Sequence, residues 1–312
     1  MNHNTRTVLV SFLLMLALTA CSIPPKPATA QPEVVPTAAG TGVFVLGKIS
    51  KEPVGEIKEN QPIADCVAAS LGEFGIGRGE VKVAEDVEGM AALIASGEVH
   101  IFFDNAFSAA QVMAISNGKP IALRIKDGPA TKRGIFFALP GSGLTSLDDL
   151  KGHVIALQDP TDIVGYLGAK VLMMDAGLNP VEVESLESHV EQDQVGYIFS
   201  GNPENTLEWV LSGKVIAGAV EEDDYKEATE KNPDIFVIIG ETEALTRHQP
   251  GLAPGNINPA LADAIVNSLV NLANTCPEAL SPSETLEFIP YSGDGKAAVE
   301  RVLEMFQLIQ DE

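Results

Sequence analysis

The chain has 312 residues, and 45% of them are hydrophobic, which is enough apolar material for one large or two medium-sized globular domains and excludes an intrinsically disordered chain. Acidic residues number 43 and basic residues 20, so the formal net charge is -23 at pH 7. A surface this negative repels phosphate backbones and anionic lipid headgroups, and the composition therefore argues strongly against nucleic-acid binding.

Residues 1–20 have the features of an export signal. Arg6 precedes the apolar run 8–18, which at about eleven residues is too short to span a bilayer but fits the core of a signal peptide. The following motif, LTAC at 18–21, resembles the bacterial lipobox, in which the cysteine thiol is acylated. We therefore expect an exported protein, lipid-anchored through Cys21 to a membrane of the cell envelope on its periplasmic or extracellular face. An ordinary cleavable signal with an incidental cysteine is the alternative.

Residues 21–42 are rich in proline, alanine and threonine. Such a segment cannot bury a core and favours extended conformations, so we interpret it as a spacer between the anchor and the folded part.

The folded part is expected to begin with a strand at 43–46, followed by a loop over 47–60 and a helix over 62–74. The glycine-rich stretch GIGRG at 75–79 invites comparison with a dinucleotide-binding loop. It follows a helix and precedes the strand 81–83, which is the reverse of the required order, so we interpret it as a flexible turn.

Helices and strands alternate through the next sixty residues. Asp86 is expected to cap a helix that ends near residue 96. The expected elements that follow are a strand at 99–103 ending at Asp104 and Asn105, a helix at 106–117, and strands at 120–125 and 134–139. This alternation is typical of an α/β fold with a mainly parallel sheet.

The stretch 142–177 predicts a junction of a kind that often holds ligands. Ser146 and Asp149 have the spacing of a capping box for a short helical turn, and a buried strand follows at 154–157. Asp159 is then expected to be the N-cap of a helix that runs to residue 177. The carboxyl end of a strand thus leads to the amino terminus of a helix, where small anions are commonly bound in open α/β sheets.

The remaining expected elements are strands at 181–183, 195–199 and 235–239 and helices at 203–211, 259–273, 281–288 and 297–309. Residues 241–247 are expected to return the chain to the first half of the protein.

Three stretches together resemble the phosphate, phosphite and phosphonate family of ABC-transporter solute-binding proteins. They are SLDDLKGHVIALQDP, GYLGAKVLMMDAGLNP and VGYIFSGNPENTLEWVLSGKVIAGAV, and the resemblance extends loosely over 43–306. It implies an α/β fold of the type II periplasmic binding protein class, with two lobes that each have a mainly parallel central sheet flanked by helices, joined by a two-strand hinge. The implied lobes are 43–139 with 241–312, and 140–240.

The resemblance also implies a function without catalysis. The protein would capture a small polar solute, phosphonate-like or phosphate-like by family, close on it by bending near Leu139 and Glu241, and present it as a monomer to an ABC permease and its ATPase. A sensor module for a membrane signalling partner is one alternative. An enzyme on the same fold is another, for which Asp104 and Glu221 would be the only acid–base candidates.

No catalytic, metal or cofactor site is indicated by the sequence. The five histidines are scattered without a pair at helical spacing, and neither Cys66 nor Cys276 has a neighbouring histidine. In an exported protein these two cysteines could form a disulfide, and the family layout would place both in the first lobe. Two separately buried thiols are the competing interpretation.

The expected ligand site departs from the family pattern. Phosphonate binders typically have a Ser-Thr-Ser-Gly run at the start of the helix after the strand, where this chain has Asp162, Ile163 and Val164. A carboxylate about 4 Å from a bound anion would cost roughly 4 kcal/mol at an effective dielectric near 20. Asp162 is either a helix-capping residue or a ligand contact, and the sequence leaves both interpretations open.

A tyrosine that relatives often have after the first acidic strand end is replaced here by Phe107. The expected cleft is therefore acidic and partly aromatic, which suits a cationic or zwitterionic solute. The candidate ligand-binding residues are Asp104, Asn105, Phe107, Thr161, Asp162, Ile163, Tyr166 and Glu221.

Overall fold

The computed structural model describes residues 40–310, which belong to one compact unit. The expected export signal, Cys21 and all but the last residues of the spacer lie outside the described residues. Their assignments stay predictions.

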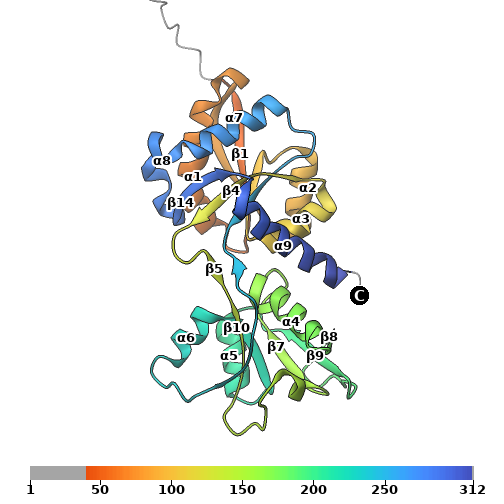
Figure 1. The fold of residues 1–312 in the computed structure, drawn as a ribbon. Coiled ribbons are helices and arrows are strands. Elements are labelled where there is room, and N and C mark those ends of the chain that lie inside the picture. The colour runs from red at the N-terminus through yellow and green to blue at the C-terminus, as the bar shows by residue number, and fades with distance from the viewer. Residues whose placement is uncertain (1–39, 311–312) are drawn as a thin grey trace, which may run out of the picture. The chain divides into compact units, whose positions relative to one another are not determined.

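Two six-stranded sheets form the framework (Figure 1). The first has the strand order β14-β4-β13-β3-β1-β2 and the second the order β11-β6-β10-β7-β9-β8. We call the first sheet with its helices the first lobe and the second sheet with its helices the second lobe. In Figure 1 the first lobe is coloured red to yellow and blue, and the second lobe green to cyan.

The first sheet is mixed. The strands are β1 (Gly42–Ile49), β2 (Ile76–Ala84), β3 (Ile101–Phe103), β4 (Lys119–Lys126), β13 (Gln249–Ala253) and β14 (Thr285–Pro290). β1 pairs in parallel with β2 and β3, whereas β13 is antiparallel to β3 and β4, and β14 is antiparallel to β4. β1, β2, β3 and β4 therefore run in one direction, and β13 and β14 run in the opposite direction.

The second sheet is also mixed. Its strands are β6 (Gly134–Ala138), β7 (Val154–Leu157), β8 (Asn179–Glu182), β9 (Gln194–Phe199), β10 (Ala217–Glu221) and β11 (Val237–Glu241). β7, β8, β9 and β10 are parallel neighbours, and β6 is antiparallel to both β10 and β11.

Helices cover both sheets. The first lobe has α1 (Pro53–Ser70), η1 (Gly72–Phe74), α2 (Val87–Ser96), α3 (Ala106–Ser116), α7 (Pro259–Val270), α8 (Leu272–Thr275), η4 (Pro277–Ala279), η5 (Ser281–Ser283) and α9 (Gly293–Gln310). The second has η2 (Leu147–Leu150), the π-helix η3 (Ile163–Gly168), α4 (Ala169–Asp175), α5 (Pro203–Leu211) and α6 (Glu222–Thr229). The predicted two-sheet α/β architecture flanked by helices is confirmed.

A short pair of strands connects the lobes. β5 (Thr131–Lys132) is antiparallel to β12 (Leu245–Thr246), and this pair forms a sheet of its own. Because β6 already belongs to the second sheet, the chain passes from the first sheet to the second over residues 127–133, before the position near Leu139 that the sequence indicated.

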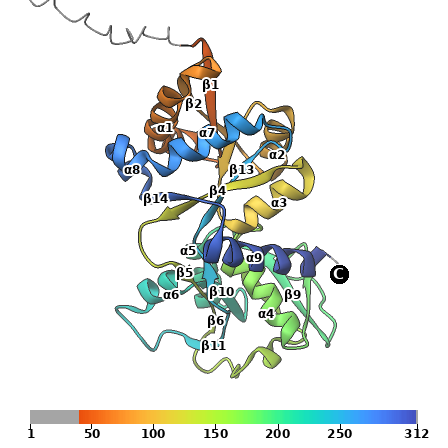
Figure 2. The same cartoon turned by 45° about the horizontal axis from the view of Figure 1, so that its top comes forward.

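The C-terminal helix α9 packs on both lobes (Figure 2). Its buried residues Val299, Val302 and Met305 belong to an apolar cluster that also contains Phe107 of the first lobe and Ile163 of the second. The lobes therefore share one stretch of hydrophobic core on this side.

Three predicted elements of the first lobe differ from the structure. α1 begins at Pro53, so most of the expected loop 47–60 is helical, and Pro62 lies inside the helix. The expected turn at 75–79 is mostly strand β2, where a Cβ at Gly77 or Gly79 would overlap neighbouring backbone. The expected helix 281–288 is a short 3-10 turn followed by the edge strand β14.

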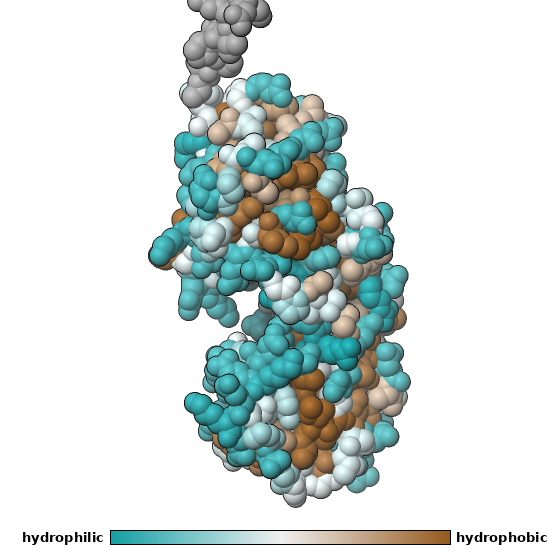
Figure 3. Space-filling model, turned by 60° about the vertical axis from the view of Figure 1, so that its left-hand side comes forward, coloured by the Kyte–Doolittle hydropathy of each residue, from teal (hydrophilic) through white to brown (hydrophobic). Residues whose placement is uncertain are grey.

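Hydrophilic residues predominate on the face of the molecule in Figure 3, and brown hydrophobic patches lie between them. Within residues 40–310, none of the helices combines the length and the apolar character that a membrane span needs.

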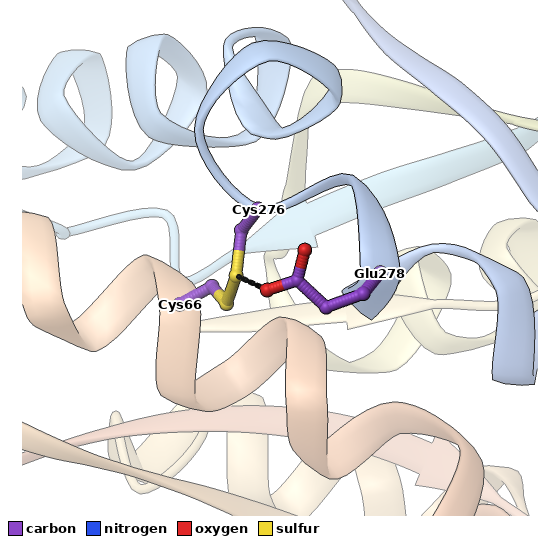
Figure 4. A group of neighbouring side chains, drawn as sticks. All are labelled: Cys66, Cys276 and Glu278. Carbon is purple, nitrogen blue, oxygen red and sulfur yellow. Dashed lines mark hydrogen bonds between the residues drawn. A yellow bond between two sulfur atoms is a disulfide. The ribbon is translucent and has the colours of Figure 1, made fainter.

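A disulfide joins Cys66 of α1 to Cys276 after α8 (Figure 4). The Cys276 Sγ also lies 3.4 Å from a carboxylate oxygen of Glu278. Of the two interpretations that the sequence left open for these cysteines, the structure has the disulfide, and both partners lie in the first lobe.

Candidate functional site

Strand ends of both lobes surround a cavity of about 610 Å³, which we call the interlobe cavity. First-lobe segments 49–51 and 85–88 lie at the ends of β1 and β2, and second-lobe residues Asp159, Pro160 and Thr161 follow β7. The carboxyl ends of parallel strands are the usual ligand-binding edge of open α/β sheets. The fold therefore places loops at this edge of each sheet on the two sides of the interlobe cavity.

Asn105 links the lobes beside this cavity. Its side-chain oxygen accepts hydrogen bonds from Phe107 N and Ser108 N, both at 2.9 Å, and so caps α3. Its amide nitrogen donates to the carbonyl oxygen of Thr161 across the lobes at 3.2 Å. Gln111, further along the same helix, donates to Pro160 O at 3.2 Å.

Asp162 is the N-cap of η3. Its Oδ1 accepts hydrogen bonds from Val164 N at 2.8 Å and Gly165 N at 2.5 Å. The expectation that Asp159 caps this helix was wrong, because Asp159 instead accepts from the backbone and hydroxyl of Thr161, and the helix begins three residues after Pro160. The backbone N–H groups at this helix start are thus already bonded to a carboxylate of the chain itself.

An acidic patch lies next to this cap, and it consists of Asp162, Glu204, Glu221 and Asp224. Burial, followed by the carboxylates of Glu221, Asp162 and Glu204, raises the pKa of Asp224 to about 6, and Lys132 partly opposes this shift. Lys132 Nζ lies 2.7 Å from Glu221 Oε2. The patch therefore has more carboxylates than cations, and it favours a positively charged partner.

The aromatic candidates are packed in the core and line neither the interlobe cavity nor the pocket described next. Phe107 and Ile163 are buried in the apolar cluster of α9. The ring of Tyr166 lies 5.9 Å from that of Phe107 and 4.9 Å from that of Phe199, and burial raises the pKa of the Tyr166 hydroxyl. The aromatic side chains that were expected in the cleft thus take part in the packing of α3, η3 and β9 against one another.

A second cavity of about 250 Å³ lies in the first lobe, and we call it the first-lobe pocket. Its lining includes the predicted Asp104 together with charged and polar residues that the sequence analysis missed, namely Lys48, Glu56, Glu59, Asn60, Arg124, Lys126 and Gln249. Ile49 lines both this pocket and the interlobe cavity. On the face drawn in Figure 3, hydrophilic surface borders an indentation.

Arg124 organises the polar interior of this pocket. It is 2% exposed and donates to Thr285 Oγ1 at 2.7 Å, Asn60 Oδ1 at 3.1 Å and Ser283 O at 3.0 Å. Burial lowers the pKa of Arg124 to about 10, while Glu56 and Asp104 act in the opposite direction. Burial likewise raises the pKa of Asp104, and Lys48 and Arg124 counteract it.

One signal in the sequence points to this pocket. Lys48 and Arg124 interrupt the apolar strands GVFVLGKI and KPIALRIK, and a charged side chain inside a buried strand needs a partner. Nothing in the spacing along the chain, however, shows that β1, β4 and β13 bring Lys48, Arg124 and Gln249 together.

Residues 40–310 contain one trio of potential metal ligands with ligand atoms close together, Cys66, Cys276 and Glu278. Two of its three ligand atoms form the disulfide, so this trio is not a metal site.

Comparison with known proteins gives a consistent result. Residues 48–296 match the family described as ABC transporter, phosphonate, periplasmic substrate-binding protein. The fold is similar to that of XAC2383 from Xanthomonas citri, solved bound to chloride ion and to ATP, with TM-scores of 0.77 and 0.76 and 23% identity. Those matches cover 86% of this chain and 99% and 98% of the XAC2383 chains.

A further similar structure is PhnD1 from Prochlorococcus marinus in complex with methylphosphonate, with a TM-score of 0.59 and 17% identity. This match covers 86% of the present chain and 99% of the PhnD1 chain.

Proposed function

This chain belongs to the periplasmic substrate-binding protein family of phosphonate ABC transporters, and from that membership we propose that it is the exported solute receptor of an importer. It captures a small polar solute and delivers it, as a monomer, to a transmembrane permease and its ATPase. The family is one of transport proteins and not of enzymes.

We propose that capture proceeds by closure of the two lobes. Support comes from the strand pair β5–β12, which connects the lobes, and from the interlobe cavity, which has lining residues from both. A solute that contacts both lobes stabilises the closed arrangement by its differential affinity for it.

We further propose that the solute carries a cationic group and is not a plain phosphate or alkylphosphonate. The observation that carries this proposal is the pair of hydrogen bonds from Val164 N and Gly165 N to Asp162 Oδ1. A helix amino terminus attracts anions through its free N–H groups, and here an internal carboxylate takes those groups and adds negative charge. The acidic patch adds three more carboxylates beside it.

The test compares solutes on the purified full-length protein in detergent by thermal shift and calorimetry. Amine-bearing solutes should raise the melting temperature, because a ligand that binds only the native state stabilises it, and methylphosphonate should not. Asp162→Ser keeps a capping oxygen but removes the charge, so it should gain at least about tenfold in affinity for methylphosphonate. Asp148→Ser, an exposed acid paired with Lys151, is the matched control. Tight methylphosphonate binding by the wild type without any response to amines would overturn the cationic-solute proposal.

Anchoring is tested separately in cells. We propose that Cys21 is acylated, so Cys21→Ser should move the protein from the membrane fraction to the soluble fraction and abolish labelling by a palmitate analogue. Unchanged membrane association and labelling would show that another feature anchors the protein.

A further inference from the structure

The first-lobe pocket contains a buried hydrogen-bond acceptor that the described part of the protein does not satisfy. Gln249 Oε1 is buried and has no hydrogen-bond partner among residues 40–310. Asp104 Oδ1 accepts from Asn105 N at 2.7 Å, while its second oxygen accepts no hydrogen bond from the part of the chain that the structure describes. A buried acceptor without a donor is costly, so Gln249 Oε1, together with the free carboxylate oxygen of the partly buried Asp104, indicates that a donor group binds in this pocket.

Donors with unused hydrogens line the same pocket. Lys48 Nζ donates to Phe103 O at 3.0 Å and lies 3.8 Å from Glu56 Oε2, and an ammonium group has three hydrogens. The three hydrogen bonds of Arg124 leave one hydrogen on each of its terminal nitrogens. A group that accepts hydrogen bonds is therefore needed in the pocket as well as a group that donates them.

The charges around the pocket are close to balanced. Lys48, Arg124 and Lys126 face the carboxylates of Glu56, Glu59 and Asp104. A lone anion or a lone cation would unbalance this set in a partly buried site, whereas a group that carries both charges would not. The pocket volume of about 250 Å³ admits a small head group and not a large solute.

We propose that the first-lobe pocket binds the head group of an α-amino acid, with the ammonium on Asp104 and Gln249 and the carboxylate on Lys48 and Arg124. This inference rests on the proposed function of solute capture and specifies the solute of that same site. The cationic end of the side chain then lies toward the acidic patch of the second lobe. The hydrogen bond from Asn105 Nδ2 to Thr161 O joins the residue after Asp104 to the residue before Asp162, which places the two parts of the site side by side.

Four related compounds separate the contributions of the groups on the solute. L-lysine has the complete head group and a cationic tail, cadaverine lacks the carboxylate, 6-aminohexanoate lacks the α-ammonium, and norleucine lacks the tail ammonium. We expect L-lysine to bind most tightly to the full-length protein. Each of the other three compounds should bind at least about tenfold more weakly, since a hydrogen bond to a charged group contributes at least the free energy of a tenfold change.

Two variants of the pocket test whether Asp104 and Gln249 bind the α-ammonium group of the solute. Asp104→Asn retains an acceptor for Asn105 N, and Gln249→Leu removes the orphaned oxygen with little change of volume. Both should weaken L-lysine about tenfold or more and leave 6-aminohexanoate unchanged, because that compound lacks the ammonium that the two residues bind. Glu98→Gln, which changes an exposed acid paired with Lys82, is the control and should alter neither affinity.

The possible outcomes distinguish this inference from the proposed function. If cadaverine binds as tightly as L-lysine, or if Asp104→Asn weakens L-lysine and 6-aminohexanoate equally, the head-group assignment is wrong while capture of amine-bearing solutes stands. If none of the four compounds raises the melting temperature while another amine-bearing solute does, this assignment falls and the cationic-solute proposal stands; if methylphosphonate binds tightly and no amine does, both fall.

Discussion

At the scale of single residues, the interior of the first lobe depends on Arg124, which is 2% exposed and forms three hydrogen bonds with Asn60, Ser283 and Thr285. Its removal would leave buried acceptors without donors and Asp104 with Lys48 but without its second cation. We expect Arg124→Ala to lower the free energy of unfolding by roughly 3–5 kcal/mol, as measured by urea denaturation.

The control is another arginine that pairs at the surface. Arg301 lies 2.7 Å from Glu243 Oε1, with a side chain that is 42% exposed. Arg301→Ala should change the free energy of unfolding by no more than about 1 kcal/mol. Equal losses in the two variants would contradict the role assigned to burial.

Asp224 makes stability depend on pH in a defined direction. Its pKa is about 6 in the folded protein against a model-peptide value of 3.8, so the folded state binds the proton more tightly than the unfolded state. The contribution of Asp224 to stability is therefore greatest below pH 3.8 and is lost as the pH rises to about 6, above which this contribution is constant. Because the side chain is only half-buried, solvent screening reduces the effect to about 1 kcal/mol.

Asp224→Asn removes this titration. Compared with the wild type, the variant should be about 1 kcal/mol more stable at pH 7.5 and equally stable near pH 3.5, as measured by urea denaturation at both pH values. Asp223→Asn, at the neighbouring exposed position, serves as the control. A stability difference between Asp224→Asn and the wild type that does not change with pH would refute the assignment.

Four of the candidate ligand-binding residues that the sequence indicated lie after the ends of strands in the structure. Asp104, Asn105, Thr161 and Asp162 follow strands, and strand ends were recognisable from apolar runs that stop at polar residues. Capping by Asp162, one of its two open interpretations, is present in the structure. Lys48, Arg124 and Gln249 were missed because they come from three strands far apart in the chain, and only the tertiary fold brings them together.

At the scale of elements, Gly79 of β2 explains how closely α1 packs on this strand. A Cβ at Gly79 would overlap the backbone of Ala64, so Gly79→Ala must displace the helix. We expect a loss of about 1–3 kcal/mol in the free energy of unfolding, measured by thermal or urea denaturation.

Gly55→Ala provides the opposite case on the same helix. A Cβ at Gly55 meets no atom within 4 Å, and alanine is the better helix former, so this variant should gain about 0.5–1 kcal/mol. A loss in both variants would show that close packing is not the reason for the glycine in β2.

Elements with strong local signals were predicted well. The capping box of Ser146 and Asp149 forms, and α5 has the predicted bounds after Asn202, which caps it. The short run TLEFIP was assigned to a helix because six residues carry too little periodicity, and its pairing with β4 decides that it is a strand. A local sequence pattern carries no information about packing against strands that are distant in the chain.

At the scale of the whole molecule, the disulfide between Cys66 and Cys276 connects residues 210 apart in the sequence. A crosslink over so long a loop restricts the unfolded chain, and its loss typically costs about 2–5 kcal/mol. We expect the double variant Cys66→Ser with Cys276→Ser to fold but to unfold at a lower temperature.

Chemical reduction of the disulfide in the wild type gives a matched measurement of its contribution to stability. A thiol reductant should lower the melting temperature of the wild type toward that of the double variant and leave the double variant unchanged. Insensitivity of the wild type to complete reduction would mean that the crosslink contributes no stability to the native state.

The two-sheet fold was predictable from the sequence through its family resemblance, whereas the crossing point between the sheets was not. Gly134–Ala138 is uniformly buried, and a fully apolar strand fits the centre of either sheet equally well. Only the pairing of β6 with β10 and β11 assigns it to the second lobe.

The apolar face that α9 shares with both lobes has a kinetic consequence. Movement of one lobe against the other must shear contacts among Val299, Val302, Phe107 and Ile163, and separation of buried hydrocarbon surface raises a barrier in proportion to its area. That barrier acts on entry and departure alike, so we expect α9, whose Phe306 and Gln310 also line the interlobe cavity, to lengthen the dwell time of a captured molecule.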